Sequence, residues 1–277
     1  MRIRIVDAFT DRPFAGNPAG VVLLEDGEFP PDDLLQDVAA EVNLSETAFA
    51  HRLPEGSEAH WALRWLTPAT EVDLCGHATL ATAHVLHTTG LATGPVRFRT
   101  RSGILTTTTE PDGGLTLDFP TAPLTEVPVP EWLAPCLAGD GRTVELLGAY
   151  DTGPLGDLLV ELPDEESVRQ LAPDHRALAA RFEARGVIVT AAAGAGVRTH
   201  DFTSRFFGPG VGIDEDPVTG SAHTALAPFW SARLGRETLT GHQGGRRRGY
   251  VRTRLRGDRT LLTGHAVTVL DGELLAP

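Results

Sequence analysis

The stretch Gly76-His77-Ala78-Thr79-Leu80-Ala81 begins a segment that stays small or apolar on nearly every side as far as Leu86. A helix that is apolar all round must be enclosed by other elements. A similar stretch, Gly220-Ser221-Ala222-His223-Thr224-Ala225, follows about half a chain length later. We therefore expect two related halves, each built around one buried helix. The alternative is a chance likeness between two segments rich in small residues.

Strand patterns surround both stretches, and they indicate an α+β fold. Alternating or continuous apolar runs predict strands at residues 2–9, 21–24, 47–53, 60–66, 143–150, 157–162, 187–192 and 197–207. Helical spacing of apolar residues predicts surface helices after Pro31 and over residues 174–185.

A proline-rich segment, residues 120–130, separates the two halves. It contains four prolines, which exclude a helix interior or a central strand. We place the domain boundary there, with an N-terminal domain at 1–121 and a C-terminal domain at 122–277. The last strand of the chain packs either on the second domain or back on the first domain.

The charge balance points to a small-molecule partner. The chain of 277 residues has 37 acidic and 24 basic side chains, a formal charge of −13. Nucleic acid and anionic membrane surfaces need a positive field, so neither is expected as a partner. No apolar run approaches the roughly 20 residues that span a bilayer, and no signal-peptide core is seen, so we expect a cytoplasmic location.

The cysteines and histidines predict no metal site. Cys75 and Cys136 are the only cysteines, and their spacing fits neither a disulfide scaffold nor a zinc motif. The histidines at 51, 60, 77, 84 and 87 form neither an H-E-x-x-H helix nor, by their spacing, a compact cluster with the cysteines. We expect two free thiols, with Cys75 small, buried and inert.

The helix starts at Gly76 and Gly220 are candidate anion sites. Backbone N–H groups in a first helical turn lack helical acceptors and can bind a carboxylate or enolate oxygen. The alternative is that each glycine only permits close packing.

Two acidic residues are candidates for proton transfer and hydrogen bonding. Glu46 interrupts the strand-forming run Asn43-Leu44-Ser45-Glu46-Thr47-Ala48-Phe49. It either faces the surface or faces a closed cleft, where desolvation would raise its pKa and suit it to exchange a proton. Of the acids before Gly220, Asp216 precedes a proline and is the better candidate for a bond inside a site, whereas Asp214 or Glu215 would cap or orient the helix.

Four segments in order are similar to the motifs of the PhzF-like phenazine-biosynthesis family. They are Val6-Asp7-Ala8-Phe9-Thr10 continuing through Pro13-Phe14-Ala15-Gly16-Asn17-Pro18-Ala19-Gly20-Val21, the Glu46 segment, Leu74-Cys75-Gly76-His77-Ala78-Thr79-Leu80-Ala81, and Phe206-Phe207-Gly208-Pro209 through Glu215 to His223. The resemblance runs from residue 1 to the strand region at 264–272.

This resemblance implies a fold like that of diaminopimelate epimerase. In that fold, two similar domains each have an antiparallel or mixed sheet curled around a central helix, and the active site lies in the cleft between them. By motif position, Glu46 would be the acid/base. The other implied site residues are His77 and Asp216 as its hydrogen-bonding partners, Gly76, Gly220 and Ser221 as substrate contacts, and Asn17 as a further candidate.

The reaction that the resemblance implies is an isomerisation without metal or organic cofactor. A proton leaves one carbon of a small carboxylate-bearing substrate, such as a dihydroaromatic acid, and returns to another. A homodimer is also implied.

Two other functions stay open. One is an amino-acid epimerase or racemase on the same fold, with Glu46 and Cys75 as a mixed pair of bases. A pair of thiols is disfavoured, because the second helix is approached by Pro217-Val218-Thr219. The other is a non-catalytic binding protein that retains the fold.

Overall fold

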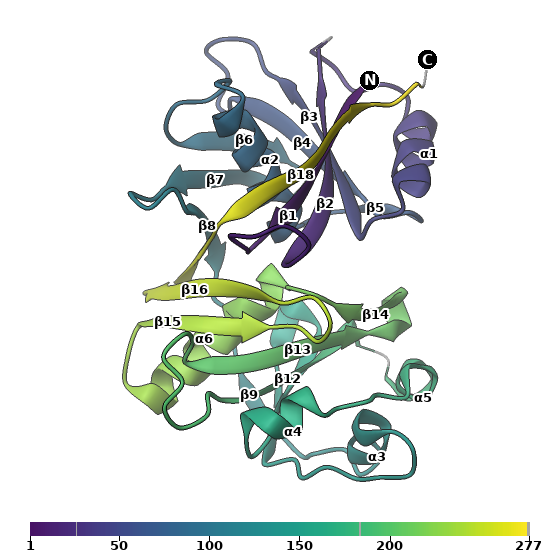
Figure 1. Cartoon of the computed structure of the whole chain (residues 1–277), viewed down its shortest axis with the longest axis vertical. Helices are drawn as coiled ribbons and strands as arrows, with labels where there is room; N and C mark the ends of the chain where they lie inside the picture. The colour runs from purple at the N-terminus through teal and green to yellow at the C-terminus, as the bar shows by residue number, and fades with distance from the viewer. Residues whose placement is uncertain (26, 183, 276–277) are drawn as a thin grey trace. The chain divides into compact units, whose positions relative to one another are not determined.

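The computed structural model describes residues 1–25, 27–182 and 184–275. The chain forms two compact units: unit 1 is Met1–Asp118 with Leu262–Pro277, and unit 2 is Phe119–Leu261 (Figure 1). The boundary placed from the prolines, between residues 121 and 122, lies beside Phe119, and the final strand is part of unit 1. Among the described residues, no helix combines the length and the apolar character that crossing a membrane requires.

Unit 1 is a mixed sheet with one enclosed helix and one surface helix. Its strands pair in the order β18-β1-β2-β3-β4-β6-β7-β8, with β5 beside β4. Their bounds are β1 Arg2–Ala8, β2 Asn17–Leu24, β3 Glu46–Arg52, β4 Trp61–Leu66, β5 Glu71–Val72, β6 Val96–Thr100, β7 Gly103–Thr109, β8 Leu115–Pro120 and β18 Ala266–Glu273. The β2–β3 and β4–β6 pairs are parallel. Parallel neighbours need a crossover, and helices α1 (Asp32–Val42) and α2 (Gly76–Thr88) supply it.

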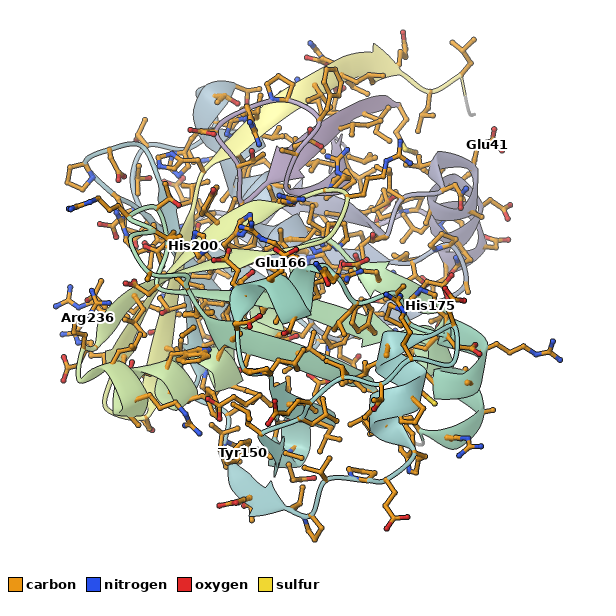
Figure 2. All side chains as sticks on the ribbon, turned by 60° about the horizontal axis from the view of Figure 1, so that its bottom comes forward. Glu41, Tyr150, Glu166, His175, His200 and Arg236 are labelled. Atoms are coloured by element: carbon orange, nitrogen blue, oxygen red, sulfur yellow. The ribbon has the colours of Figure 1, made fainter. Side chains whose placement is uncertain are left out.

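Helix α2 is the enclosed helix predicted from the sequence, and the structure confirms it. It contacts β1, β2, β3 and β18, and nine of its side chains are buried. Its threonines tolerate burial because their hydroxyls bond within the helix: Thr79 Oγ1 donates to Cys75 O at 2.6 Å and Thr82 Oγ1 to Ala78 O at 2.8 Å. By contrast, α1 lies at the surface, with Glu41 pointing to solvent (Figure 2).

Unit 2 repeats this plan around a second enclosed helix, α6 (Gly220–Leu234), which contacts β15 and β16. Its strands are β9 Thr125–Val127, β10 Gly148–Asp151, β11 Asp157–Glu161, β12 Gly186–Ala192, β13 Phe202–Gly208, β14 Ile213–Asp216, β15 Thr238–Gln243 and β16 Gly249–Arg256. Short helices α3 (Leu133–Ala138), α4 (Glu165–Arg169) and α5 (His175–Arg181) and the 3₁₀ turns Gly153–Leu155 and Pro209–Val211 join them. Strand β17 (Arg259–Gly264) leads back towards unit 1.

Strand orientation recurs from one unit to the other. In unit 1 the pairs β1–β2, β2–β3, β3–β4, β4–β6 and β6–β7 are antiparallel, parallel, antiparallel, parallel and antiparallel. In unit 2 the pairs β10–β11, β11–β12, β12–β13, β13–β15 and β15–β16 follow the same sequence of orientations. The enclosed helix stands at the same step of both units. This correspondence favours related halves over a chance likeness of two helix starts.

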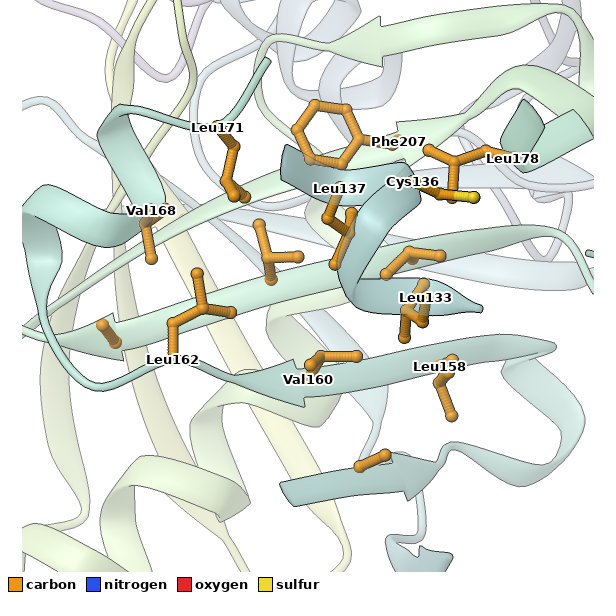
Figure 3. Close-up of a cluster of buried hydrophobic side chains, with 14 residues drawn as sticks. Leu133, Cys136, Leu137, Leu158, Val160, Leu162, Val168, Leu171, Leu178 and Phe207 are labelled. Carbon is orange, nitrogen blue, oxygen red and sulfur yellow. The ribbon is translucent and has the colours of Figure 1, made fainter. Parts of the chain in front are cut away.

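Two apolar clusters cover the faces of the unit 2 sheet. One packs α6 against the strands and includes Phe202, Phe206 and Trp230. The other, drawn in Figure 3, packs α3, α4 and α5 against the opposite side and includes Leu137 and Cys136. Cys136 thus has a packing role, and the expected burial of Cys75 is confirmed.

Several predicted boundaries in unit 2 are wrong. The strand expected at 143–150 is confined to Gly148–Asp151, because pairing with β11 begins at Gly148. The strand expected at 197–207 begins at Phe202, since the Asp201 side chain accepts a bond from the backbone N–H of Thr240. Residue 183 of the helix expected at 174–185 lies outside the described residues. Within the described part, the helix is His175–Arg181, and it begins where Asp174 caps the N–H of Ala177 at 2.9 Å.

Candidate functional site

A largely buried acid–imidazole pair lies at the start of α2. His77 Nε2 is 3.2 Å from Glu46 Oε2, and the two side chains are only 6% and 12% exposed. Glu46 therefore does not face bulk water, and the surface-facing alternative for it is wrong. Cys75, the residue before α2, places Sγ 3.5 Å from the other ring nitrogen of His77, Nδ1.

Local structure explains why these groups meet. Glu46 is the first residue of β3 and lies in register with Ala19 of β2. In-register neighbours point to the same face of a sheet, and so do residues two apart along a strand. Asn17, buried at the start of β2, therefore faces the same side as Glu46. On that side lies α2, which contacts both strands.

Burial keeps His77 neutral. It lowers the pKa of the imidazole from 6.5 to about 3, because charging a ring without water around it is costly. A neutral ring has one donor and one acceptor nitrogen. If the Cys75 thiol donates to Nδ1, then the ring hydrogen is on Nε2, the nitrogen 3.2 Å from Glu46 Oε2. Cys75 is thus placed to set the tautomer of His77.

This arrangement corrects the expectation that no histidine clusters with a cysteine. Glu46, Cys75 and His77 bring one ligand atom each within 4.8 Å of one another, a set that could also hold a metal ion. Sequence spacing missed it because Glu46 lies on strand β3, 31 residues before His77 of helix α2.

Asp216 ends β14 in unit 2 and is held by the start of α6. Thr219 Oγ1 donates to Asp216 Oδ2 at 2.6 Å. Fully buried Gln243, at the end of β15, accepts from Thr219 N at 3.0 Å and donates to Thr219 Oγ1 and to Asp216 O at 2.9 and 3.0 Å. Thr219 thus holds the carboxylate of Asp216, and Gln243 holds both Thr219 and the backbone carbonyl of Asp216. Sequence reasoning missed Thr219 and Gln243, which carry no local signal.

Ser221, in the first turn of α6, meets an unexpected cation. Arg185 Nη2 donates to Ser221 Oγ at 3.1 Å and the same guanidinium pairs with Asp157. Burial raises the pKa of Asp157 to about 6, and Arg185 acts against that rise. Arg185 therefore brings positive charge to the first turn of α6, where Gly220 is buried. No sequence motif indicated Arg185.

The other two acids before Gly220 have different roles from those expected. Glu215 forms a two-pronged ion pair with Arg205, at 2.7 and 2.8 Å, instead of capping or orienting α6. Asp214 is exposed. The reason is the β13–β14 hairpin, which turns Glu215 towards the buried Arg205 of β13.

The predicted residues thus fall into two groups, each ordered within its own unit. Unit 1 brings together Glu46, His77 and the α2 start at Gly76, with Asn17 on the same face. Unit 2 brings together Asp216, Gly220 and Ser221 at the start of α6.

Comparison with known proteins identifies relatives over the whole chain. A sequence model described as phenazine biosynthesis-like protein (PhzC-PhzF) matches residues 6–272. An uncharacterized isomerase of Pseudomonas aeruginosa is 46% identical, and the alignment covers 97% of this chain and 96% of the relative.

Solved structures give the same result. A phenazine biosynthesis protein of the PhzF family from Enterococcus faecalis matches with a TM-score of 0.88 and 39% identity over 99% of both chains. A predicted epimerase from Pseudomonas aeruginosa, at 20% identity, matches with a TM-score of 0.70 over 100% of this chain and 99% of its own, a likeness of fold. These neighbours confirm the predicted α+β fold of the diaminopimelate epimerase-like type.

Proposed function

Because the chain belongs to the phenazine biosynthesis-like (PhzC-PhzF) family, we propose that it is an isomerase that moves a proton within a small carboxylate-bearing metabolite. Glu46 is the acid and base of this reaction, and no cofactor takes part. A relative named as an isomerase supports the reaction class. The substrate class, which includes dihydroaromatic acids, rests on the family resemblance.

The observation that carries the proposal is the position of Glu46 against the neutral ring of His77. A neutral neighbour orients a carboxylate without holding it permanently ionised, whereas a cation would lower its affinity for protons. A group that must take a proton and then return it needs that balance.

The proposed reaction has two proton transfers and no net change in protons. The Glu46 carboxylate removes a proton from a substrate carbon, and the electron pair of that C–H bond spreads into the unsaturated acid. The carboxylic acid then returns the proton to a different carbon on the same face. Backbone N–H groups at Gly76 and Gly220 stabilise the negative charge that develops on the substrate oxygens.

Unit 2 supplies substrate contacts in this proposal. Asp216, held in place by Thr219 and Gln243, forms a hydrogen bond with the substrate. Ser221, next to the Arg185 guanidinium, binds the substrate carboxylate. Asn17, which lies on the same face of the sheet as Glu46, is a further substrate contact in this proposal.

The spacing of Glu46 and Cys75 argues against an epimerase with these two as bases. Two bases on opposite faces of a carbon, each about 3–3.5 Å away, stand about 6–7 Å apart. The Glu46 oxygen and the Cys75 sulfur lie within 4.8 Å of each other. They would approach a substrate from the same side, which suits transfer on one face.

The test is turnover by Glu46→Gln, with Glu41→Gln as the matched control. Glu41 is an exposed glutamate on α1 (Figure 2). Cyclohexadiene carboxylates and amino acids form the substrate panel, followed by ultraviolet absorbance and by deuterium uptake from D₂O. We expect Glu46→Gln to lose about 10²–10⁴-fold in kcat while still binding the substrate, and Glu41→Gln to match wild type.

Undiminished turnover by a folded Glu46→Gln protein would refute the assignment. Binding of panel acids without turnover by the wild type would favour the non-catalytic alternative. Deuterium uptake at an amino-acid α-carbon with inversion would favour the epimerase.

A further inference from the structure

A second cluster of potential metal ligands lies in unit 2, away from the residues assigned to proton transfer. Glu165 of α4, His200 before β13 and His242 of β15 each offer one ligand atom, and these atoms lie within 4.8 Å of one another. All three side chains are at least 90% buried. Figure 2 labels His200 and, on α4, Glu166, the neighbour of Glu165.

The distances suit ligands of one tetrahedral ion. Glu165 Oε1 lies 2.9 Å from His200 Nε2, and the ring centroids of His200 and His242 lie 4.9 Å apart. Zinc bonds of about 2.0–2.1 Å in tetrahedral geometry put two ligand atoms about 3.3 Å apart and two imidazole centroids about 5 Å apart. Small side-chain rotations would therefore bring the three ligands onto one ion.

Neighbouring groups already orient two of the ligands. Thr199 Oγ1 is 3.0 Å from His200 Nδ1, the ring nitrogen on the side away from Glu165. Gly194 N donates to Glu165 Oε2 at 2.9 Å, which leaves Oε1 directed at His200. Such supporting bonds are characteristic of the residues around metal ligands.

Hydrogen bonds within the described part of the chain do not satisfy both ring nitrogens of His242. Its Nδ1 is buried and has no hydrogen-bond partner within the described part of the chain.

One cation competes for the same carboxylate. Arg169, four residues after Glu165, forms an ion pair with Glu165 Oε1. Its side chain is 43% exposed, so its guanidinium can move into water when a metal ion takes its place. Because the two cations compete for Glu165, removal of the Arg169 charge should strengthen the binding of a metal ion.

We propose that Glu165, His200 and His242 bind one divalent cation of the zinc type, with water completing the coordination. Two imidazoles and one carboxylate favour zinc or cobalt over magnesium or calcium, which prefer all-oxygen sites. The site is independent of Glu46 and of the proposed isomerase reaction.

The experiment is a titration of the EDTA-treated full chain with Zn²⁺ by calorimetry and with Co²⁺ by visible absorption. We expect one cation per chain with Kd below about 100 µM and the absorption of four-coordinate Co²⁺. His242→Gln should bind at least about tenfold more weakly. Arg169→Met should bind at least about threefold more tightly, because it removes the competing charge.

Cys75→Ser separates this site from the cluster of Glu46, Cys75 and His77. Wild-type affinity in Cys75→Ser supports the proposal, and loss of binding there overturns it. A wild-type Kd above about 100 µM also overturns it, as does unchanged affinity in His242→Gln with a wild-type circular dichroism spectrum. If His242→Gln does not fold, Arg169→Met decides: unchanged or weaker affinity overturns the proposal.

Discussion

His223 makes the stability of unit 2 depend on pH in a way that can be measured. Its side chain in α6 is fully buried, Nδ1 donates to Thr219 O at 2.9 Å, and burial lowers its pKa from 6.5 to about 4. The unfolded chain therefore binds more protons than the folded chain between pH 6.5 and about 4. Stability due to this group is present above pH 6.5 and is lost as the pH falls through that window.

The pKa difference sets the magnitude. A change from 6.5 to about 4 corresponds to about 3 kcal/mol when fully expressed. Between pH 7.5 and pH 4.5 the loss amounts to about 2.5 kcal/mol. His223→Gln removes the titrating ring. Between these two pH values, its free energy of unfolding should therefore fall by about 2.5 kcal/mol less than that of wild type. Other buried histidines titrate equally in both proteins, and their effects cancel in the difference.

The assay is urea unfolding of wild type and His223→Gln at both pH values, with His265→Gln as the control. His265 is exposed, so its replacement should leave the acid sensitivity of the wild type unchanged. If His223→Gln and wild type lost the same free energy of unfolding between pH 7.5 and 4.5, the explanation by burial would be wrong.

Three further predictions concern packing and the proposed site. Gly241→Ala should destabilise by about 1–3 kcal/mol in thermal unfolding, since its Cβ would lie 2.6 Å from an aromatic ring and 2.9 Å from a histidine nitrogen; wild-type stability would contradict this. Leu137→Ala should lower the free energy of unfolding by about 2–5 kcal/mol, whereas Leu147→Ala, at an exposed position, should lower it by less than about 0.5 kcal/mol. Both values are read from urea unfolding, and equal losses would contradict the assignment of Leu137 to the core. Thr219→Val removes the bond to Asp216, so kcat should fall about 10- to 100-fold; an unchanged kcat would remove Asp216 positioning from the mechanism.

The enclosed helices could be predicted from sequence because their pattern is local. A helix such as α2, with small and apolar residues on every side, has one stable environment, and burial of Ala78, Leu80 and Ala81 follows from it. The short strands could not be bounded in this way. Whether residues 143–147 join a ladder depends on where β11 ends, because Gly148 already pairs with Glu161, the last residue of that strand.

The same distinction between local and long-range signals applies to the residues of the candidate sites. Glu46 and His77 were found through motifs, and the structure brings them within 3.2 Å. Gln243 could not be found, because it is 24 residues from Thr219 and reaches it only through the parallel pairing of β13 with β15. Glu165 and His200 are likewise 35 residues apart and meet only in the folded chain.

The fate of a deuterium label tests most directly whether one carboxyl group carries the proton. A substrate identified from the panel would be labelled at the carbon that loses hydrogen, and the product would be analysed by NMR. The account predicts that part of the label appears on the receiving carbon, on the same face, in wild type. Complete loss of the label, with hydrogen arriving on the opposite face, would show a second base and contradict the role given to Glu46.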